Sequence, residues 1–207
     1  MTQPFWESQG RVGVQVHSTA IVDVGARLGD EVSVGPYTII GPGVSVGAGT
    51  AIGSHVLVER DTTLGEQCQI AQGAVLGSDP QDLKYEGELS HLYVGDRTVI
   101  REYATLNRGT RASRKTVVGS DCLIMAYVHV AHDCEIGNHV ILCNAVNMAG
   151  HVAIEDWVII GGLTAIHQWV RIGAHSFCGG GSRIPQDIPP YLRVAGNPAS
   201  LYGLNTV

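Results

Sequence analysis

The dominant pattern in this sequence is an aliphatic residue at every sixth position. The series runs from Val16 to Ile184, and it is broken at Asp82, Glu88 and Ala112. A small residue precedes most of these positions by two, and glycine follows many of them directly. Because side chains two apart share one face of a strand, each hexad predicts a short strand with two inward-facing residues, followed by a corner. We expect the glycine to supply the backbone freedom that the corner needs.

A six-residue unit cannot close a core alone, whereas three units per turn form a triangular coil with an 18-residue repeat. Stacking such coils buries columns of aliphatic side chains and pairs each strand with those above and below it. The sequence therefore predicts an all-β fold, a parallel β-helix shaped as a triangular prism. Helical periodicity is absent through this region, which argues against a doubly wound α/β sheet. The pattern itself leaves the handedness of the coil open.

The breaks in the pattern divide the chain. We expect an N-terminal extension at residues 1–10, the β-helix at 11–184 and an extended tail at 185–207 that runs back along the prism. Two loop insertions are expected at about 78–92 and 108–115, and function often collects on such loops. The second insertion, RGTRASRK, carries four cationic residues, and on composition alone it is a solvated loop. These residues are Arg108, Arg111, Arg114 and Lys115.

Composition narrows the classes of function. The formal net charge of −6 provides no basic field for nucleic acid or an anionic membrane. The five cysteines form no C-x-x-C pair, so they indicate buried apolar residues in a reducing compartment rather than a disulfide frame. The first residues lack a signal peptide, and no apolar run is long enough to cross a bilayer. We therefore expect a cytoplasmic protein.

The 18-residue repeat brings several polar residues into register. One predicted column holds His132, Gly150 and Gln168, the next holds Asp133, His151 and Trp169, a third holds His129, Asn147 and Ala165, and His167 lies beside Gln168. Four histidines thus gather within three successive coils. A single histidine at a corner is more often a solvent-facing residue. The four histidines together with Asp133 indicate a site.

Two kinds of chemistry suit this cluster. His132 could act as a general base, with Asp133 fixing its tautomer and the Gly150 amide facing an oxyanion. No serine or cysteine is clearly paired with the base, which suggests direct attack by an acceptor hydroxyl. Alternatively, three histidines from neighbouring coils or subunits could bind zinc, as in carbonic anhydrases of the same fold. The spacing within HVAHD does not decide between the two.

Longer motifs add a resemblance. The hexads resemble the left-handed parallel β-helix of hexapeptide-repeat acyltransferases, and several segments resemble the UDP-N-acetylglucosamine O-acyltransferase family of lipid A biosynthesis. The segments are GSDPQDLKYEGE, IREYATLNRGT, LIMAYVHVAHDCEIGN, NMAGHV, IIGGLTAIHQWVRIGAH, GGGSRIPQDIPPY and AGNPA. They span most of the chain in order. Members of this family usually continue past GLNTV with a helical domain, whereas this sequence ends at Val207.

The resemblance implies an activity and a set of site residues. A 3-hydroxyacyl group would pass from acyl carrier protein to the 3-hydroxyl of UDP-N-acetylglucosamine, with no cofactor beyond the phosphopantetheine of the donor and no metal. His132 would be the general base, Asp133 its partner and Gly150 the oxyanion donor. The residues implied in substrate binding are Asp82, Lys84, His129, His151, His167, Gln168 and Asn205. Gly180 would set the acyl length, and its missing side chain predicts a long chain.

The resemblance also implies a homotrimer with sites between neighbouring prisms. The basic loop would then be a landing surface for the acidic carrier protein. The alternatives that remain are an acyltransferase acting on a related amino sugar nucleotide, a zinc-dependent carbonic anhydrase, and a trimeric scaffold without activity.

Overall fold

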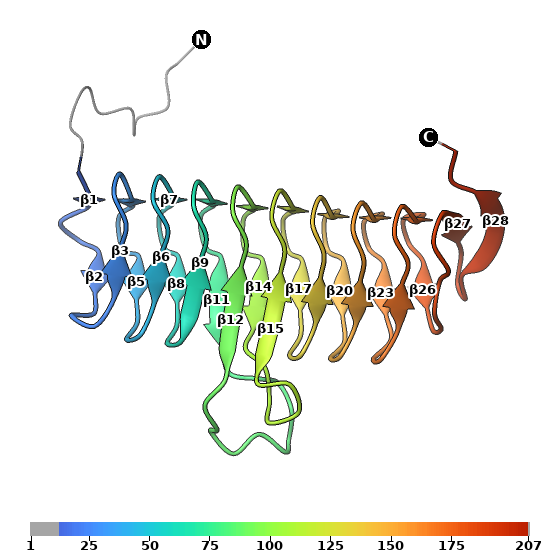
Figure 1. Cartoon of the computed structure of the whole chain (residues 1–207), viewed down its shortest axis with the longest axis horizontal. Helices are drawn as coiled ribbons and strands as arrows, with labels where there is room; N and C mark the ends of the chain where they lie inside the picture. The colour runs from blue at the N-terminus through green and yellow to red at the C-terminus, as the bar shows by residue number, and fades with distance from the viewer. Residues whose placement is uncertain (1–12, 207) are drawn as a thin grey trace, which may run out of the picture.

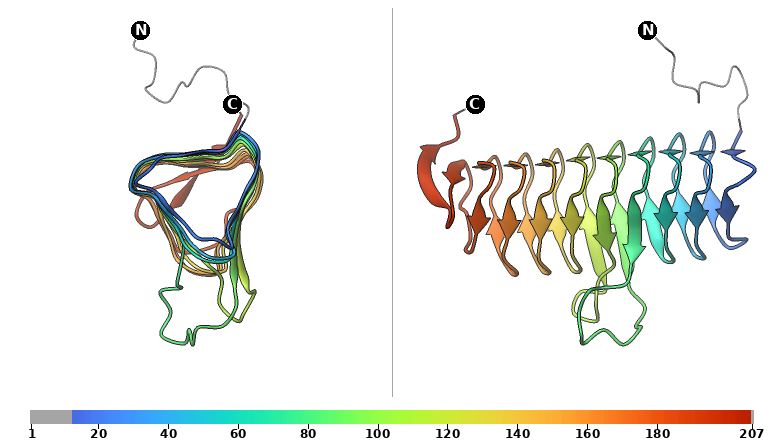
Figure 2. Two further views of the ribbon diagram at one scale, coloured as in Figure 1. Left: turned by 90° about the vertical axis from the view of Figure 1, so that its left-hand side faces the viewer. Right: turned by 180° about the vertical axis from the view of Figure 1, so that it is seen from behind.

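The computed structural model describes residues 13–206, and these residues form a prism of stacked triangular coils (Figure 1). Viewed along its length, the prism has a three-sided cross-section (Figure 2). Three sheets form the sides, and within residues 13–206 there is no helix. The predicted all-β parallel β-helix is therefore confirmed. The predicted N-terminal extension, residues 1–10, lies outside the described residues.

From β1 to β26 the three sheets receive every third strand in turn, and β27 and β28 both join the first sheet. Sheet A has 11 strands: β1 (Gln15–Val16), β4 (Ser33–Val34), β7 (Ala51–Ile52), β10 (Gln69–Ile70), β13 (Val99–Ile100), β16 (Leu123–Ile124), β19 (Ile141–Leu142), β22 (Ile159–Ile160), β25 (Phe177–Cys178), β27 (Leu192–Ala195) and β28 (Ser200–Leu204). Sheet B has 9 strands: β2 (Ile21–Val22), β5 (Ile39–Ile40), β8 (Leu57–Val58), β11 (Val75–Ser78), β14 (Thr105–Asn107), β17 (His129–Val130), β20 (Asn147–Met148), β23 (Ala165–Ile166) and β26 (Arg183–Ile184). Sheet C has 8 strands: β3 (Arg27–Leu28), β6 (Ser45–Val46), β9 (Thr62–Leu64), β12 (His91–Val94), β15 (Lys115–Val118), β18 (Glu135–Ile136), β21 (Ala153–Ile154) and β24 (Arg171–Ile172).

The hexad positions build the core as expected. The sixth-position aliphatic residues from Val34 onward are buried, and so are the small residues two positions earlier. Where the small residue is threonine, its hydroxyl is hydrogen-bonded inside the coil. For example, Thr38 Oγ1 donates to the carbonyl of Gly53 at 2.7 Å and accepts from the amide of Val56 at 3.1 Å. A buried polar group is therefore tolerated in the core because its hydrogen bonds are satisfied.

The corners correct the prediction about glycine. Except at Gly77, the glycine directly after the aliphatic residue does not take a positive φ; a Cβ built on Gly47 would lie 2.5 Å from the carbonyl carbon and oxygen of Gly65 in the next coil. This glycine is needed because the coils approach closely, not because the backbone bends there. The left-handed conformation occurs two residues later and is held by ordinary side chains such as Tyr37, His55 and Asp133. At these positions the side chains project outward from the edges of the prism.

Two insertions leave the prism on the same side (Figure 1). Residues 79–90 connect β11 to β12 and residues 108–114 connect β14 to β15; we call them loop 79–90 and loop 108–114. The loops are bonded to each other, because the amide of Arg111 donates to Glu88 Oε1 at 2.8 Å and the Arg111 side chain donates from Nη2 to the carbonyl of Lys84 at 3.4 Å.

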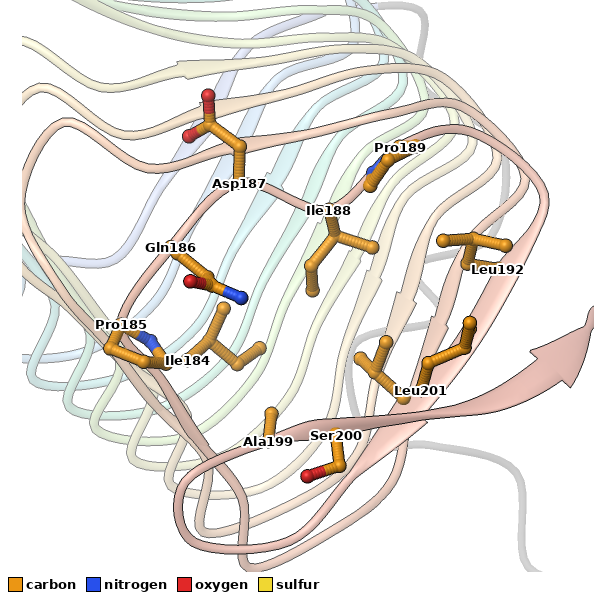
Figure 3. A pocket seen from close by; sticks show the side chains of 11 residues that line it. Ile184, Pro185, Gln186, Asp187, Ile188, Pro189, Leu192, Ala199, Ser200 and Leu201 are labelled. Atoms are coloured by element: carbon orange, nitrogen blue, oxygen red, sulfur yellow. The ribbon is translucent and has the colours of Figure 1, made fainter.

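The C-terminal segment differs from the prediction. Instead of running back along the prism, it adds β27 in parallel to β25 and then reverses into β28, which pairs antiparallel with β27. This hairpin covers the end of the aliphatic column. A cavity of about 410 Å³ lies beneath it, lined by residues such as Ile184, Ile188 and Leu201 (Figure 3). The tail therefore acts as a cap, because the last coil would otherwise expose its core.

Candidate functional site

The edge between sheets B and C, hereafter the B–C edge, carries the residues that the sequence brings into register. The pairing of His129 with Asn147 and of Asn147 with Ala165 confirms the predicted 18-residue columns. The corner after β17 presents His132 and Asp133, and the corner after β20 presents Gly150 and His151. The amide of His151 donates to the carbonyl of His132 at 3.1 Å, which joins the two corners.

His132 and Asp133 form a pair. His132 Nδ1 lies 2.8 Å from Asp133 Oδ2, and the Asp133 side chain is fully buried while that of His132 is 12% exposed. Since an ionised carboxylate only accepts, Nδ1 carries the proton of this hydrogen bond. Nε2 is then the nitrogen with the free lone pair. The arrangement leaves a base at the surface of the edge and its acidic partner beneath it.

Loop 108–114 surrounds the Asp133 carboxylate. Thr110 donates from its amide to Oδ1 at 3.0 Å and from its hydroxyl to Oδ2 at 2.7 Å. Ser113 donates its amide to Oδ1 at 3.2 Å and its hydroxyl to the same oxygen. Burial alone would raise the pKa of this carboxyl, but the hydrogen bonds from His132, Ser113 and Thr110 outweigh it and hold the pKa well below its ordinary value. Asp133 is therefore held as a carboxylate.

Gly150 lies directly against the ring of His132. A Cβ at Gly150 would come within 2.5 Å of His132 Cε1, 2.8 Å of Nε2 and 3.0 Å of Nδ1. Only glycine fits between this backbone and the ring. The amide of Gly150 donates no hydrogen bond within residues 13–206, so it is free to face a ligand.

His151 completes the inner cluster. Its ring stands edge-on to the ring of His132, with centroids 5.1 Å apart, and its Nε2 lies 3.9 Å from Asp133 Oδ2. The indole of Trp169 stacks on its face at 3.8 Å and an interplanar angle of 1°. Burial lowers the pKa of His151 and outweighs the opposing attraction of Asp133, so the surroundings favour the neutral form of this ring.

His129 lies one strand before the pair, on the outer face of sheet B. Its Nδ1 is 2.8 Å from the hydroxyl of Thr105 on the neighbouring strand. Burial, followed by repulsion from His132, lowers the pKa of His129. His129 thus offers a second imidazole close to the base, and its surroundings favour the neutral form.

The remaining predicted residues lie farther out. His167 and Gln168 are exposed at the next corner of the B–C edge, with His167 Nδ1 3.1 Å from the carbonyl of Gln168. In loop 79–90, Asp82 Oδ1 accepts from the amide of Lys84 at 3.0 Å, and Asp82 also acts electrostatically on His151. Loop 79–90 therefore lies close enough to His151 for the charge of Asp82 to act on it.

Two predicted residues lie on other edges. Gly180 is exposed at the corner between sheets A and B, where a Cβ would lie 3.1 Å from the carbonyl oxygen of Gly162. Asn205 follows β28, and its Nδ2 donates to the carbonyl of His175 at 2.8 Å, at the corner between sheets C and A. Within one chain these residues do not join His132. Each of the three edges of the prism carries one part of the predicted set.

The interpretation of RGTRASRK as a solvated basic loop is wrong for its first arginine. The Arg108 side chain is fully buried, donates to the carbonyl of Gly77 and to Asp79, and lies 3.3 Å from the Tyr85 hydroxyl. It ties loop 79–90 to the prism and is not part of a landing surface. Arg111 is exposed and lies 3.8 Å from Glu86. A charge count could not separate these two arginines, because burial is decided by the three-dimensional path of the loops.

A metal at this edge would have His132, Asp133 and His151 as candidate ligands, since their ligand atoms lie within 4.8 Å of one another. This is one carboxylate and two imidazoles rather than the three histidines expected for a carbonic anhydrase. The carboxylate is already bonded to one of the two imidazoles and to four donors from loop 108–114. A metal bound by Asp133 would have to displace hydrogen bonds that already fill the acceptor positions of this carboxylate, so the geometry favours a base with its acidic partner.

The sequence reasoning missed Thr110 and Ser113. Neither is in register with the hexads, because both lie in an insertion. Thr105 was missed for another reason: it is an ordinary outward strand residue whose role appears only through its pairing with His129.

Comparisons with known proteins agree with this arrangement. Residues 25–60 and 115–150 match the family model described as bacterial transferase hexapeptide (six repeats). An acyl-(acyl-carrier-protein)–UDP-N-acetylglucosamine O-acyltransferase from Paracidovorax citrulli is 56% identical over 193 residues, which cover 93% of this chain and 74% of the relative. One from Chlorobium phaeobacteroides is 75% identical over 117 residues, 56% of this chain and 44% of that protein. The part of this chain that matches the Chlorobium phaeobacteroides protein thus covers less than half the length of that relative.

Solved structures agree as well. A crystal form of the Acinetobacter baumannii protein described as LpxA superimposes with a TM-score of 0.91 at 46% identity, covering 92% of this chain and 74% of that one. The likeness confirms that the coil is the left-handed parallel β-helix that the resemblance implied. Within the described residues, none forms a helix that could span a membrane.

Proposed function

Because the chain belongs to the acyl-(acyl-carrier-protein)–UDP-N-acetylglucosamine O-acyltransferase family, we propose that it moves a 3-hydroxyacyl group from acyl carrier protein to the 3-hydroxyl of UDP-N-acetylglucosamine. This would be the first step of lipid A biosynthesis, carried out in the cytoplasm. The observation that carries the proposal is the His132–Asp133 pair packed against the Gly150 amide at one edge of the prism. The donor needs no cofactor beyond its own phosphopantetheine.

In the proposed reaction, His132 Nε2 removes the proton of the sugar hydroxyl as its oxygen attacks the thioester carbonyl carbon. The negative charge moves to the carbonyl oxygen, where the Gly150 N–H donates a hydrogen bond. The carbon–sulfur bond then breaks, and the proton held by His132 passes to the leaving thiolate. Asp133 stabilises the imidazolium while the proton resides there, without itself taking the proton.

The outer residues suit binding roles. Lys84 and Asp82 on loop 79–90 can reach a sugar nucleotide. Along the B–C edge, His129, His151, His167 and Gln168 offer polar groups that can donate or accept hydrogen bonds. Asn205 and Gly180 lie on the other two edges, so one prism cannot bring them to its own His132. A homotrimer with sites between neighbouring prisms would resolve this, with a second chain supplying nucleotide and acyl contacts. We include that assembly in the proposal.

The direct experiment incubates the protein with UDP-N-acetylglucosamine and 3-hydroxyacyl carrier proteins of several chain lengths and identifies the product by mass. A product heavier than the sugar nucleotide by one 3-hydroxyacyl group supports the proposal. The amino analogue of the sugar nucleotide serves as a competing acceptor, and a preference for it would reassign the acceptor atom. Hydration of carbon dioxide dependent on zinc, without acyl transfer, would contradict the proposal.

A further inference from the structure

Loop 108–114 makes contacts to the site that charge alone does not explain. Its Thr110 is 5% exposed, and Thr110 and Ser113 each use both an amide and a hydroxyl on the Asp133 carboxylate. Together with His132 Nδ1, these donors give the carboxylate five hydrogen bonds. Two oxygens of a carboxylate offer about four lone-pair directions, so the acceptor capacity of Asp133 is filled.

The loop is built to hold this position. The Arg108 side chain is fully buried and anchors the start of the loop, and a Cβ on Gly109 would lie 2.2 Å from the amide nitrogen of Lys115. The amide of Arg114 closes a turn on the carbonyl of Thr110 at 2.7 Å. From the other side, Asp133 takes a φ of 59°, and its own amide donates to Thr116 Oγ1 at 2.9 Å. The carboxylate is thus fixed from both the corner and the loop.

We propose that Thr110 and Ser113 are positioning residues for the reaction: they hold the Asp133 carboxylate against Nδ1 of His132, so that Nε2 stays the basic nitrogen, and they set how strongly the carboxylate stabilises the protonated ring. The proposal rests on the proposed function for the identity of the reaction. Neither residue touches the substrate in this role; both act through Asp133.

The two parts of this role act in opposite directions on the base. Orientation keeps the carboxylate next to Nδ1, which favours the imidazolium. Each hydroxyl bonded to the carboxylate also draws off part of its negative charge, which weakens its pull on the imidazolium. Deleting one hydroxyl leaves three loop donors in place, so orientation persists while the carboxylate becomes a stronger partner. The base should then become more basic.

Other charged and titratable groups face the pair from neighbouring elements and must stay constant in any test. They are His129 on β17, His151 on the next corner, the buried Cys134 thiol, Asp82 on loop 79–90, and Glu135 and Arg171 on the outer face of sheet C beside the site. The substitutions below change none of them.

The test is an NMR titration of the whole protein labelled with ¹⁵N in its histidine rings, with the His132 signals assigned from a His132→Gln variant. We expect Thr110→Val and Ser113→Ala to raise the pKa of His132 by on the order of half a unit to one unit while the proton stays on Nδ1. Thr110→Ser retains the donor and should titrate as the wild type does. Thr98→Val is the matched control, because Thr98 is a buried threonine with two hydrogen bonds at a different edge of the prism.

A purely structural role would lower the melting temperature of Thr110→Val and Thr98→Val alike and leave the His132 titration unchanged. A His132 pKa in Thr110→Val that equals the Thr98→Val value, or falls below the wild-type value, overturns the proposal. In the same variants, the low-pH limb of the pH profile of kcat/KM for acyl transfer should shift to higher pH. The KM for the sugar nucleotide should change by less than about twofold. If the NMR shift appears but the wild type transfers no acyl group, the positioning stands and the proposed function fails.

Discussion

Gly150 is the position where one added methyl group should have the largest effect on the base. In Gly150→Ala the new Cβ would lie 2.5 Å from His132 Cε1, and its φ is not in the left-handed region, so the backbone itself accepts alanine. Carbon atoms in ordinary contact are about 3.5–4.0 Å apart, so the ring must retreat by about 1 Å. That movement displaces Nε2 and strains the 2.8 Å bond from Nδ1 to Asp133.

A misplacement of about 1 Å at a reacting group costs on the order of 100-fold in rate. We therefore expect kcat of Gly150→Ala to fall by at least that factor, while the far-ultraviolet circular dichroism stays that of the wild type. Gly25→Ala is the matched control, because a Cβ there meets the end of the Asp23 side chain at 3.2 Å, in the N-terminal coils and away from the site.

The assay is acyl transfer at saturating substrates in a double-mutant cycle with His132→Ala. If the methyl acts through the ring, Gly150→Ala costs nothing further once His132 is alanine, because the group that it displaces is gone. Full additivity of the two losses, or a Gly150→Ala variant within twofold of the wild-type rate, would refute the reasoning.

Three further predictions concern acyl length, acid stability and the C–A edge. Gly180→Met should shift the preferred donor to a shorter acyl chain in competition assays with mixed carrier proteins, and an unchanged preference would remove Gly180 from that role. The pKa of Asp133 in the folded state is depressed below its ordinary 3.8, so the carboxylate stabilises the fold fully above about pH 4, and this stabilisation is lost as the pH falls further. Urea unfolding should therefore find Asp133→Asn less stable than the wild type at pH 7. The difference in free energy of unfolding between the two proteins should shrink in acid. Asn138→Ala removes the acceptor that the Ser120 amide uses at 2.9 Å, and calorimetry should show a loss of about 1 kcal/mol, or 2–4 °C in Tm, with kcat unchanged.

The hexads predicted the fold because each one obeys a local rule. A strand period of two and a repeat of six fix which side chain faces inward, and three hexads per coil fix which residues stack. The 18-residue spacing predicts that His129, Asn147 and Ala165 stack in one column, and the pairing of β17, β20 and β23 has that register.

The loops could not be predicted in this way, because an insertion breaks the register that makes the arithmetic possible. Thr110 and Ser113 look like ordinary loop residues, and Arg108 looks like a surface cation, until the loop is seen to fold back on the corner of Asp133. The prediction that the glycine after the aliphatic residue supplies backbone freedom holds for Gly77, which has a φ of 76°, but elsewhere the cause is the close approach of the next coil. That cause involves residues 18 positions away, as in Gly47 against Gly65, and is not visible in a single hexad.

The C-terminal segment was mispredicted for a related reason. Its prolines correctly excluded a helix, but they do not say where an extended segment goes. The exposed end of an aliphatic column attracts apolar residues, and β27 places Val194 there at 8% exposure. The segment forms a cap because burying the apolar end of the last coil is favourable, and no local sequence signal indicates this position.

The most direct measurement of the central claim is the rate of acyl transfer from 3-hydroxyacyl carrier protein to UDP-N-acetylglucosamine in the wild type and in His132→Ala, with both proteins at the same oligomeric state. General-base catalysis by one residue contributes on the order of 10²- to 10⁴-fold, so the substituted protein should be slower by a factor in that range. Equal rates in the two proteins, or no transfer by the wild type, would contradict the claim that the His132–Asp133 pair at the B–C edge performs this chemistry.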